Sequence, residues 1–310
     1  MNTDKIYDLL IVGAGPAGLT AAIYGLRYNM DILVVGGVPG GLVSESHEIC
    51  NWPGDNKITG AELSVKMFKH AQDLGAEIVI DIINSINKTG DNFEIKTASG
   101  KNFKAKQVLL TLGTDHRKLG LPEEAGFAGR GVTYCATCDG MFFKGKNVAV
   151  VGGGNSAMTA ALFLADICPQ VYLIYRGTEL KGEVTWMQET DAKKNIIKIS
   201  QTNIIKLSGE NKLQKITLDK PYNNSAEIAV EGLFVEVGTL PKTELFKSLG
   251  GELDEFGNIK VNIDQSTNIP GVWAAGDGTS GSNHFRQIVT AVSEGAIAAD
   301  SIFKALKAKK

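Results

Sequence analysis

Two cysteines separated by two residues, with an acid directly after them, have the residue types and spacing for redox chemistry. They are Cys135 and Cys138, followed by Asp139, in the sequence Cys-Ala-Thr-Cys-Asp. Such a pair can form a small disulfide and be reduced again to a dithiol, and the acid can accept and donate the protons that this exchange requires. If the pair begins a helix, the aligned backbone amides lower a thiol pKa and favour the reactive thiolate.

The same spacing would suit half of a zinc site, which needs two further ligands at similar spacing. Cys50 and Cys168 each stand alone, and no histidine pair completes a ligand set. We therefore predict that the chain holds no metal, and that Cys50 and Cys168 are inert structural thiols.

A glycine-rich turn near the start of the chain has the spacing of a dinucleotide fingerprint. The turn consists of Gly13, Ala14, Gly15, Pro16, Ala17 and Gly18. An apolar run at residues 7–12 precedes it, and a helix-forming stretch at 19–27 and an apolar run at 31–35 follow. This order of strand, turn, helix and strand is the context that G-x-G-x-x-G requires. The first two glycines permit the tight turn and the approach of a pyrophosphate to the helix N-terminus, and the third permits close packing.

The same pattern recurs near the middle of the chain. A second turn consists of Gly152, Gly153, Gly154, Asn155, Ser156 and Ala157. It follows an apolar run at residues 147–151 and precedes a helical stretch at 158–166 and a strand-like run at 171–175. One such turn is a weak signal, because glycine-rich turns are common and both could be ordinary turns of an α/β sheet. Two of them, each in this context, predict two dinucleotide-binding domains.

A third signal lies near the end of the chain, where a short apolar run closes on Gly276 and Asp277. An acid at the C-terminal end of a strand can reach a ribityl or ribose hydroxyl of a bound cofactor. An ordinary turn aspartate would fit the pattern equally well. Residues 287–306, which follow, are expected to form a helix.

Turn-forming residues at 114–117 and 238–242 mark two crossings between domains, so that one fingerprint domain is inserted into the other. Lys and Arg total 32 against 34 Asp and Glu, a balance that argues against a general nucleic-acid surface. No apolar run reaches membrane-spanning length, and the first residues do not lead into a signal peptide. We therefore expect a soluble, cytoplasmic protein. Most cytoplasmic cysteines stay reduced, so a disulfide that forms there is expected to be catalytic.

In this arrangement the chain resembles the bacterial-type, low-molecular-weight thioredoxin reductases over nearly its whole length. The motifs that carry the resemblance are Gly13-Ala14-Gly15-Pro16-Ala17-Gly18, Asn51-Trp52-Pro53-Gly54, Thr111-Leu112-Gly113, Cys135-Ala136-Thr137-Cys138-Asp139, Gly152-Gly153-Gly154-Asn155-Ser156-Ala157, Gly276-Asp277 and Arg286-Gln287. The resemblance implies a homodimer with one FAD per chain and an α/β fold of two Rossmann-like, three-layer domains. Residues 1–116 and 244–310 would form the FAD-binding domain, and residues 117–243 an inserted NAD(P)H-binding-like domain that carries the cysteine pair.

The resemblance also assigns roles to individual residues. The FAD site would comprise Gly13, Gly15, Pro16, Ala17, Gly18, Asn51, Gly276, Asp277, Arg286 and Gln287, with Asp277 on the ribityl chain. The nicotinamide nucleotide site would comprise Gly152, Gly154, Asn155, Ser156, Ala157, Arg176 and Lys181. Cys138 would be the thiol next to the flavin, Cys135 would attack the disulfide of a partner, and Asp139 would act as the acid.

The chain departs from the family where related enzymes hold the 2′-phosphate of NADPH. The family usually has a His-Arg-Arg cluster and a further Arg at this place. Here Arg176 is kept, Gly177 replaces the second arginine of the cluster, and Lys181 replaces the later one. No acid follows the strand directly, which argues against NADH, and Arg176, Lys181 and Ser156 still offer charge and a donor to a phosphate. NADPH is therefore the expected donor, with weakened binding.

The sequence leaves other activities open. The flavin could be reduced by ferredoxin or flavodoxin instead of a nicotinamide. A dithiol oxidase that closes disulfides in small molecules and passes electrons to oxygen would keep the same cysteine pair. An FAD-binding sensor or scaffold is a further alternative, although Asp139 beside an intact pair speaks against it. The leading hypothesis is an enzyme that reduces the disulfide of thioredoxin or a thioredoxin-like protein.

Overall fold

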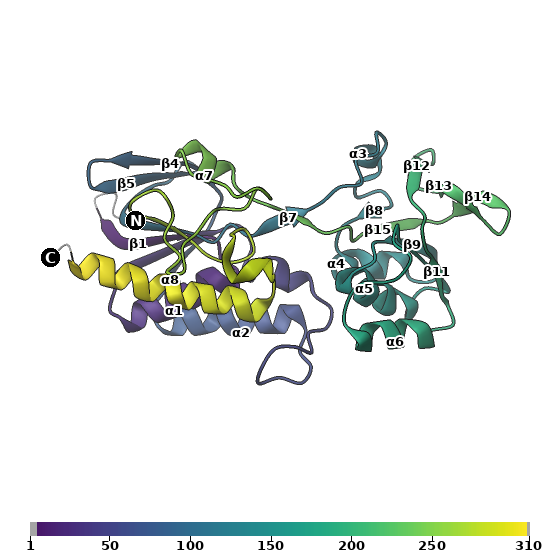
Figure 1. The fold of residues 1–310 in the computed structure, drawn as a ribbon, viewed down its shortest axis with the longest axis horizontal. Coiled ribbons are helices and arrows are strands. Elements are labelled where there is room, and N and C mark those ends of the chain that lie inside the picture. Colours follow the sequence, from purple (N-terminus) through teal and green to yellow (C-terminus); the bar gives the residue numbers. More distant parts are fainter. Residues whose placement is uncertain (1–4, 309–310) are drawn as a thin grey trace. The chain divides into compact units, whose positions relative to one another are not determined.

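The computed structural model describes residues 5–308, and the chain divides into two compact units (Figure 1). Unit 1 comprises Met1–Asp115 and Leu240–Lys310, and unit 2 is the continuous segment His116–Thr239. The second division thus falls at residues 239/240, whereas we predicted a boundary at 243/244. The two passages of the chain between the units are short strands, β7 (Thr114–His116) and β16 (Thr239–Pro241), which pair with each other.

Unit 1 is organised around one sheet, to which both stretches of chain contribute. Its strands follow the order β3, β2, β1, β6, β5 and β4, and β17 also pairs with β6. Their bounds are β1 (Ile6–Val12), β2 (Ile32–Gly36), β3 (Glu77–Ile80), β4 (Ile83–Thr89), β5 (Asn92–Thr97), β6 (Asn102–Leu110) and β17 (Val272–Ala274). Strand β6 runs parallel to β1 and β17 but antiparallel to β5. The central strands therefore end together at one edge of the sheet, where β17 delivers the Gly276-Asp277 pair.

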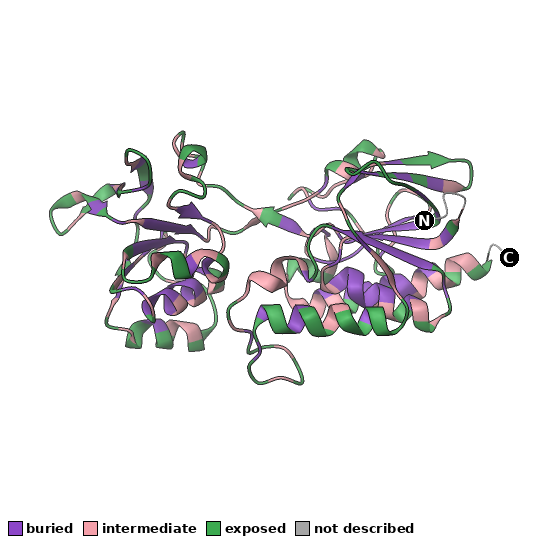
Figure 2. Cartoon of the chain, turned by 180° about the vertical axis from the view of Figure 1, so that it is seen from behind, coloured by how far each residue is buried: buried purple, intermediate pink, exposed green. Residues whose placement is uncertain are grey.

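The alternation of side chains in β1 explains why both faces of this sheet are covered. Leu9 and Ile11 pack with residues of α1 (Pro16–Arg27) and α8 (Ile288–Ala308) on one face. Leu10 and Val12 point to the other face, where residues from the β4–β5 hairpin and α7 (Glu244–Ser248) complete the core. Figure 2 shows the buried strands and the buried sides of these helices. A strand buried on both faces is expected to be apolar, as β1 is over the buried run Leu9–Val12.

Unit 1 contains three further helical elements. They are the 3₁₀ helices η1 (Gly41–Glu45) and η3 (Gly281–His284) and the helix α2 (Gly60–Asp73). Thr59 caps α2, since its side chain accepts a hydrogen bond from the amide of Glu62 at 3.2 Å and the Glu62 carboxylate accepts from the Thr59 amide at 3.1 Å. This reciprocal capping fixes where α2 begins.

Unit 2 has a parallel sheet of its own, in the order β11, β10, β9, β15 and β8. The bounds are β8 (Val132–Thr133), β9 (Asn147–Val151), β10 (Gln170–Ile174), β11 (Ile196–Ile199) and β15 (Gly232–Val235). One face packs against α5 (Asn155–Ala165) and its neighbours. The other packs against an antiparallel sheet of β12 (Ile204–Ser208), β13 (Lys215–Tyr222) and β14 (Ser225–Ala229). The remaining helical segments are α3 (Glu124–Phe127), α4 (Ala136–Asp139), η2 (Gly140–Phe143) and α6 (Val184–Ala192).

The predicted α/β class with two Rossmann-like domains is confirmed. The main local difference is that both fingerprint helices begin earlier than predicted, α1 at Pro16 and α5 at Asn155. Proline is well suited to a first helical position, because its missing amide hydrogen would have no partner there. No helix within residues 5–308 is long and apolar enough to span a membrane.

Candidate functional site

Cys135 and Cys138 form a disulfide at the start of α4, with their Cα atoms 5.4 Å apart. Cys135 is the residue that caps the helix, and its Sγ accepts a hydrogen bond from the amide of Cys138 at 3.1 Å. Cys138 is exposed, and Cys135 is half-buried. An amide directed at the Cys135 sulfur favours its thiolate once the disulfide opens. The helix start on which the sequence argument depended is therefore present.

A buried threonine, Thr133, connects the first cysteine with the acid after the second. Its hydroxyl donates a hydrogen bond to Oδ2 of Asp139 and accepts one from the amide of Cys135 at 3.3 Å. The Asp139 amide also donates to the carbonyl of Cys135 at 3.2 Å. These contacts hold the Asp139 carboxylate close to the cysteine pair, where it can exchange protons with a dithiol.

The residue before the pair, Tyr134, is held by a buried acid. Its hydroxyl donates to Glu124 Oε1 at 2.7 Å. The same Glu124 carboxylate accepts from the amides of Leu119 and Gly120 at 3.0 and 2.8 Å. Burial, together with Glu124, raises the pKa of Tyr134 well above its usual range, so its hydroxyl stays protonated. Tyr134 therefore anchors the segment that leads into Cys135.

The first glycine turn has the close contacts that its spacing predicts. At Gly13, where φ is +118°, an added Cβ would stand 2.2 Å from the carbonyl oxygen of Thr111. At Gly18 a Cβ would stand 2.1 Å from the carbonyl oxygen of Gly13. A Cβ on Gly15 would meet only the carbonyl oxygen of Gly40, at 4.0 Å. Gly13 and Gly18 are thus required by packing, whereas Gly15 borders open space where a ligand can approach the backbone.

The start of α1 has the polarity expected for an anion site. Gly15 precedes the helix without a side-chain cap, and the first turn contains no acid. The amides of this turn therefore carry the partial positive charge of the helix with no carboxylate of the helix itself to neutralise it. Strand β2 ends beside the turn at Gly36, where a Cβ would stand 2.6 Å from the amide nitrogen of Ala14.

Gly276 and Asp277 lie beside this turn. A Cβ on Gly276, whose φ is +87°, would stand 3.1 Å from the Cβ of Ala17. The fingerprint and the Gly-Asp element, far apart in the sequence, are therefore neighbours. Burial raises the pKa of Asp277 to about 6, with Arg286 acting to lower it and Glu294 to raise it. Hydrogen bonds donated by hydroxyl groups of a ligand would stabilise such a buried carboxylate.

The other residues predicted for the FAD site also come together. Asn51 Nδ2 donates a hydrogen bond to Gln287 Oε1 at 3.1 Å, although the two are 236 positions apart in the chain. Arg286 Nη2 donates to Oδ1 of the fully buried Asn258 at 2.8 Å. Asn258 Nδ2 in turn donates to both carboxylate oxygens of Asp254. Arg286 is thereby held near Asp277, whose pKa it influences.

The second glycine turn resembles the first in its packing. A Cβ on Gly152, whose φ is +145°, would stand 2.1 Å from the carbonyl oxygen of Glu236. Gly154 precedes α5 without a side-chain cap, and a Cβ there would meet only the carbonyl oxygen of Lys181, at 3.7 Å. Ala157, at the third position of the motif, is fully buried. Its small side chain permits the close packing that a third glycine would permit.

The loop after β10 folds back onto this second turn. The Lys181 amide donates to the carbonyl of Gly153 at 2.7 Å, and the Glu183 amide donates to Asn155 Oδ1 at 2.8 Å. Arg176, Lys181 and Ser156 are all exposed. The charged residues predicted to meet a 2′-phosphate are therefore available at the edge of the turn, and Gly177 among them contributes no side chain.

Some functional contacts were missed by the sequence analysis. Thr133 gave no signal beyond strand propensity. Glu294 did give a signal in the sequence, because it falls on the apolar side of α8 together with Ala291, Ala298 and Ile302, all of which are buried.

The two remaining cysteines differ from each other. Burial raises the pKa of Cys168 to about 11, as expected for an inert thiol, but Cys50 is exposed.

Comparisons with known proteins agree with this arrangement. The chain matches the family model for pyridine nucleotide-disulphide oxidoreductases over residues 7–295. It is 37% identical over 305 residues to a thioredoxin reductase of Bacillus subtilis, covering 97% of this chain and 95% of the relative. The crystal structure of Lactococcus lactis thioredoxin reductase superposes with a TM-score of 0.92 at 36% identity, covering 97% of this chain and 99% of that one.

A ferredoxin-flavin thioredoxin reductase from Clostridium acetobutylicum is also similar, at 32% identity with a TM-score of 0.53, covering 97% of this chain and 98% of that one. The resemblance to low-molecular-weight thioredoxin reductases is therefore confirmed over nearly the whole length of the chain. From these matches we conclude that the chain belongs to the pyridine nucleotide-disulphide oxidoreductase family and is an oxidoreductase of the thioredoxin reductase type.

Proposed function

We propose that this protein reduces the disulfide of thioredoxin or a thioredoxin-like protein through Cys135 and Cys138, with FAD as its bound cofactor. The observation that carries the proposal is the disulfide at the start of α4 in a chain that also has two glycine turns, each beginning a helix. Its relatives named as thioredoxin reductases support the choice of substrate.

The residues of the first turn fit FAD. The open space at Gly15 and the uncapped start of α1 suit a pyrophosphate, and Asp277 offers an acceptor for ribityl hydroxyls. Asn51 and Gln287, hydrogen-bonded to each other, and Arg286 would lie along the flavin. When bound, FAD supplies the electron pair that opens the Cys135–Cys138 disulfide.

The thiol steps follow from the positions of the two cysteines. The Cys135 thiolate, favoured by the Cys138 amide, attacks one sulfur of the partner disulfide, and the other partner sulfur leaves and takes up a proton. The Cys138 thiolate then attacks Cys135 in the mixed disulfide, which restores the Cys135–Cys138 disulfide and releases the second partner thiol. The partner gains two electrons and two protons, and Asp139 exchanges protons with the pair.

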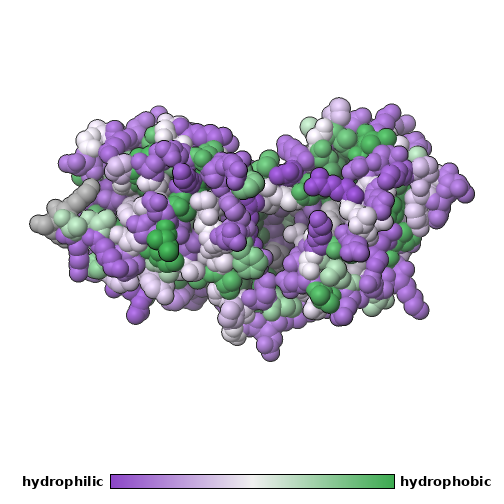
Figure 3. Space-filling view, in the orientation of Figure 1, coloured by the Kyte–Doolittle hydropathy of each residue, from purple (hydrophilic) through white to green (hydrophobic). Residues whose placement is uncertain are grey.

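A protein substrate also needs a surface on which to dock. Met141 and Phe142 follow Asp139 in η2, and their side chains are 57% and 75% exposed. Figure 3 shows that the visible face of each unit is mainly hydrophilic, with apolar residues in small groups. Large apolar side chains exposed beside the redox pair support docking of a protein there.

We further propose NADPH as the electron donor, bound at the second turn through Gly152, Gly154, Asn155, Ser156 and Ala157. Arg176 and Lys181 would meet its 2′-phosphate. A ferredoxin or flavodoxin donor is the second candidate, because Gly177 leaves the phosphate site short of an arginine and one similar structure is a ferredoxin-flavin thioredoxin reductase. We also expect the protein to act as a homodimer in the cytoplasm.

Two measurements test these proposals. In Cys138→Ser, the Cys135 mixed disulfide with the partner should accumulate, because no second thiol resolves it, and Cys135→Ser should form none. Equal turnover by both variants and the wild type would remove the cysteines from the mechanism. For the donor, anaerobic flavin reduction is followed with NADPH, NADH and reduced ferredoxin in parallel. Reduction by ferredoxin but by neither nucleotide at millimolar levels would refute NADPH.

A further inference from the structure

Helix α8 places a buried carboxylate directly behind the Gly276-Asp277 element. Glu294 is 4% exposed, and its Oε2 accepts hydrogen bonds from the amide of Gly276 at 2.7 Å and from the hydroxyl of Thr279 at 3.3 Å. Both donors, a backbone amide and a threonine hydroxyl, are uncharged groups. Because burying a carboxylate in this way lowers stability, its presence here suggests a function.

Two glycines allow Glu294 to reach this position. A Cβ on Gly281 would stand 2.5 Å from Glu294 Oε1, so a side chain at this position would displace the carboxylate. A Cβ on Gly295 would stand 2.2 Å from the carbonyl oxygen of Ala17. The neighbour of Glu294 thus lets α8 approach the first turn of α1. Helix α8 thereby contacts both elements that are proposed to hold FAD.

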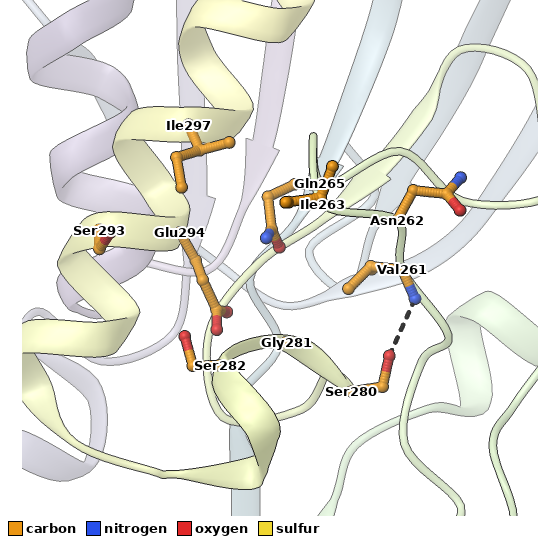
Figure 4. Close-up of a pocket in the computed structure, with 10 residues that line it drawn as sticks. All are labelled: Val261, Asn262, Ile263, Gln265, Ser280, Gly281, Ser282, Ser293, Glu294 and Ile297. Carbon is orange, nitrogen blue, oxygen red and sulfur yellow. Dashed lines mark hydrogen bonds between the residues drawn. The ribbon is translucent and has the colours of Figure 1, made fainter.

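Glu294 also lines a pocket of about 340 Å³, shown in Figure 4. Ser280, Ser282 and Ser293 line it with hydroxyl groups, and the buried Gln265 lines it with its amide. The picture shows the Glu294 side chain extending from α8 toward Gly281, with Gln265 beside it.

Glu294 and Asp277 also influence each other electrostatically. Asp277 faces Arg286 and Glu294, and the charge of Glu294 acts with burial to raise the pKa of Asp277 to about 6. A change of charge at Glu294 should therefore change the pH at which Asp277 becomes a full carboxylate. A side chain that merely filled space could not have this effect.

We propose that Glu294 is a positioning residue of the flavin site, which fixes the turn from Gly276 to Thr279 so that Asp277 meets the ribityl chain of FAD. The proposal rests on the proposed function, since it requires that the protein binds FAD. It adds to that function a charged residue that acts through Asp277 and does not itself touch the cofactor.

The test measures FAD affinity of the apoprotein by quenching of flavin fluorescence, from pH 5 to pH 8. Glu294→Gln keeps an acceptor for Gly276 and Thr279 but removes the charge. Its affinity at pH 8 should stay within about threefold of wild type, and the pH at which affinity falls should move downward. Glu294→Ala removes the acceptor and should weaken FAD binding on the order of ten- to a hundredfold at pH 8, the range for hydrogen bonds to charged groups.

The matched control is Ser293→Ala, which changes the adjacent residue in the same pocket and should leave FAD affinity and its pH profile unchanged. Thermal unfolding of each apoprotein shows whether the variants are folded. If Glu294→Ala does not fold, Glu294→Gln still decides the test. An unchanged pH profile in Glu294→Gln would overturn the proposal. Failure of the wild type to bind FAD would instead refute the proposed cofactor, so the two failures are distinguishable.

Discussion

At the scale of single residues, the reactive groups could be predicted from the sequence, but their supports could not. Cys135, Cys138 and Asp139 lie within five residues of the chain, and the redox interpretation followed from their spacing together with the two glycine turns and the lack of further metal ligands. Thr133 and Glu124 act through side-chain contacts that depend on how α4 and the preceding segment fold. Asp277 was predicted as a hydrogen-bond acceptor. Its raised pKa, however, comes from burial and from the charge of Glu294, and the position of Glu294 depends on how α8 packs.

The raised pKa of Asp277 predicts a stability effect in the apoprotein. The folded-state pKa is about 6 and the ordinary value is 3.8, so the folded state holds more protons than the unfolded state between these values. Stability should therefore fall as pH rises from about 4 to about 6. Asp277→Asn cannot ionise, and at pH 8 it should be more stable than wild type by up to about 3 kcal/mol, at 1.36 kcal/mol per pKa unit.

Urea unfolding of the two apoproteins at pH 4 and pH 8 measures this difference, which should disappear at pH 4. Asp300→Asn serves as a control of opposite sign, because the hydrogen bond from Lys304 lowers the pKa of Asp300. The same Asp277→Asn variant should hold FAD less tightly, so that loss of function accompanies a gain in stability. A variant that is less stable than wild type at pH 8 would contradict this account of Asp277.

At the scale of elements, both strand–turn–helix units could be predicted because their glycines are required locally. Gly13 and Gly152 lie in conformations with positive φ where a Cβ would also collide with a neighbouring carbonyl. The loop after β10 was not predictable in this way. Its position depends on hydrogen bonds from Lys181 and Glu183 to the second turn, and such contacts leave no periodic pattern in the sequence.

This loop carries the prediction about the electron donor. Gly177 has no positive φ, and a Cβ there would meet the carbonyl oxygen of Glu179 at 3.1 Å, so a side chain needs only a small shift of an exposed loop. Gly177→Arg should tighten NADPH binding on the order of tenfold or more, because a guanidinium can form paired hydrogen bonds with the 2′-phosphate. Gly177→Gln, which lacks the charge, should give little of this gain.

The measurement is the rate of flavin reduction against nucleotide concentration. NADH lacks the phosphate, so Gly177→Arg should leave its concentration dependence unchanged. An equal gain for NADH and NADPH would show that the new arginine does not meet the 2′-phosphate. No gain for either would mean that the loop is not part of a nucleotide site.

At the scale of the whole molecule, the two units differ in how the chain forms them. Unit 1 needs both of its stretches, because β17 and α8 from the second complete the sheet and core begun by the first. Unit 2 is continuous, and its core clusters on both faces of the parallel sheet consist of its own residues. The sequence indicated the insertion through its two glycine turns, whereas the turn-like composition of residues 240–243 does not define the second boundary to the residue.

A continuous unit with its own core should fold by itself, and this permits a test of the donor without the flavin. A fragment of residues 116–239 should unfold cooperatively and keep the Cys135–Cys138 disulfide.

The fragment contains a single tryptophan, Trp186, which packs against the core beside the loop that carries Arg176 and Lys181. Titration with NADPH should quench or shift the fluorescence of Trp186, and NADH should do so only at higher concentration. A fragment that folds but binds neither nucleotide at millimolar concentration would leave the second turn as a structural element. Because unit 2 alone supplies every residue proposed for that site, absence of binding would direct the search for the donor to a protein.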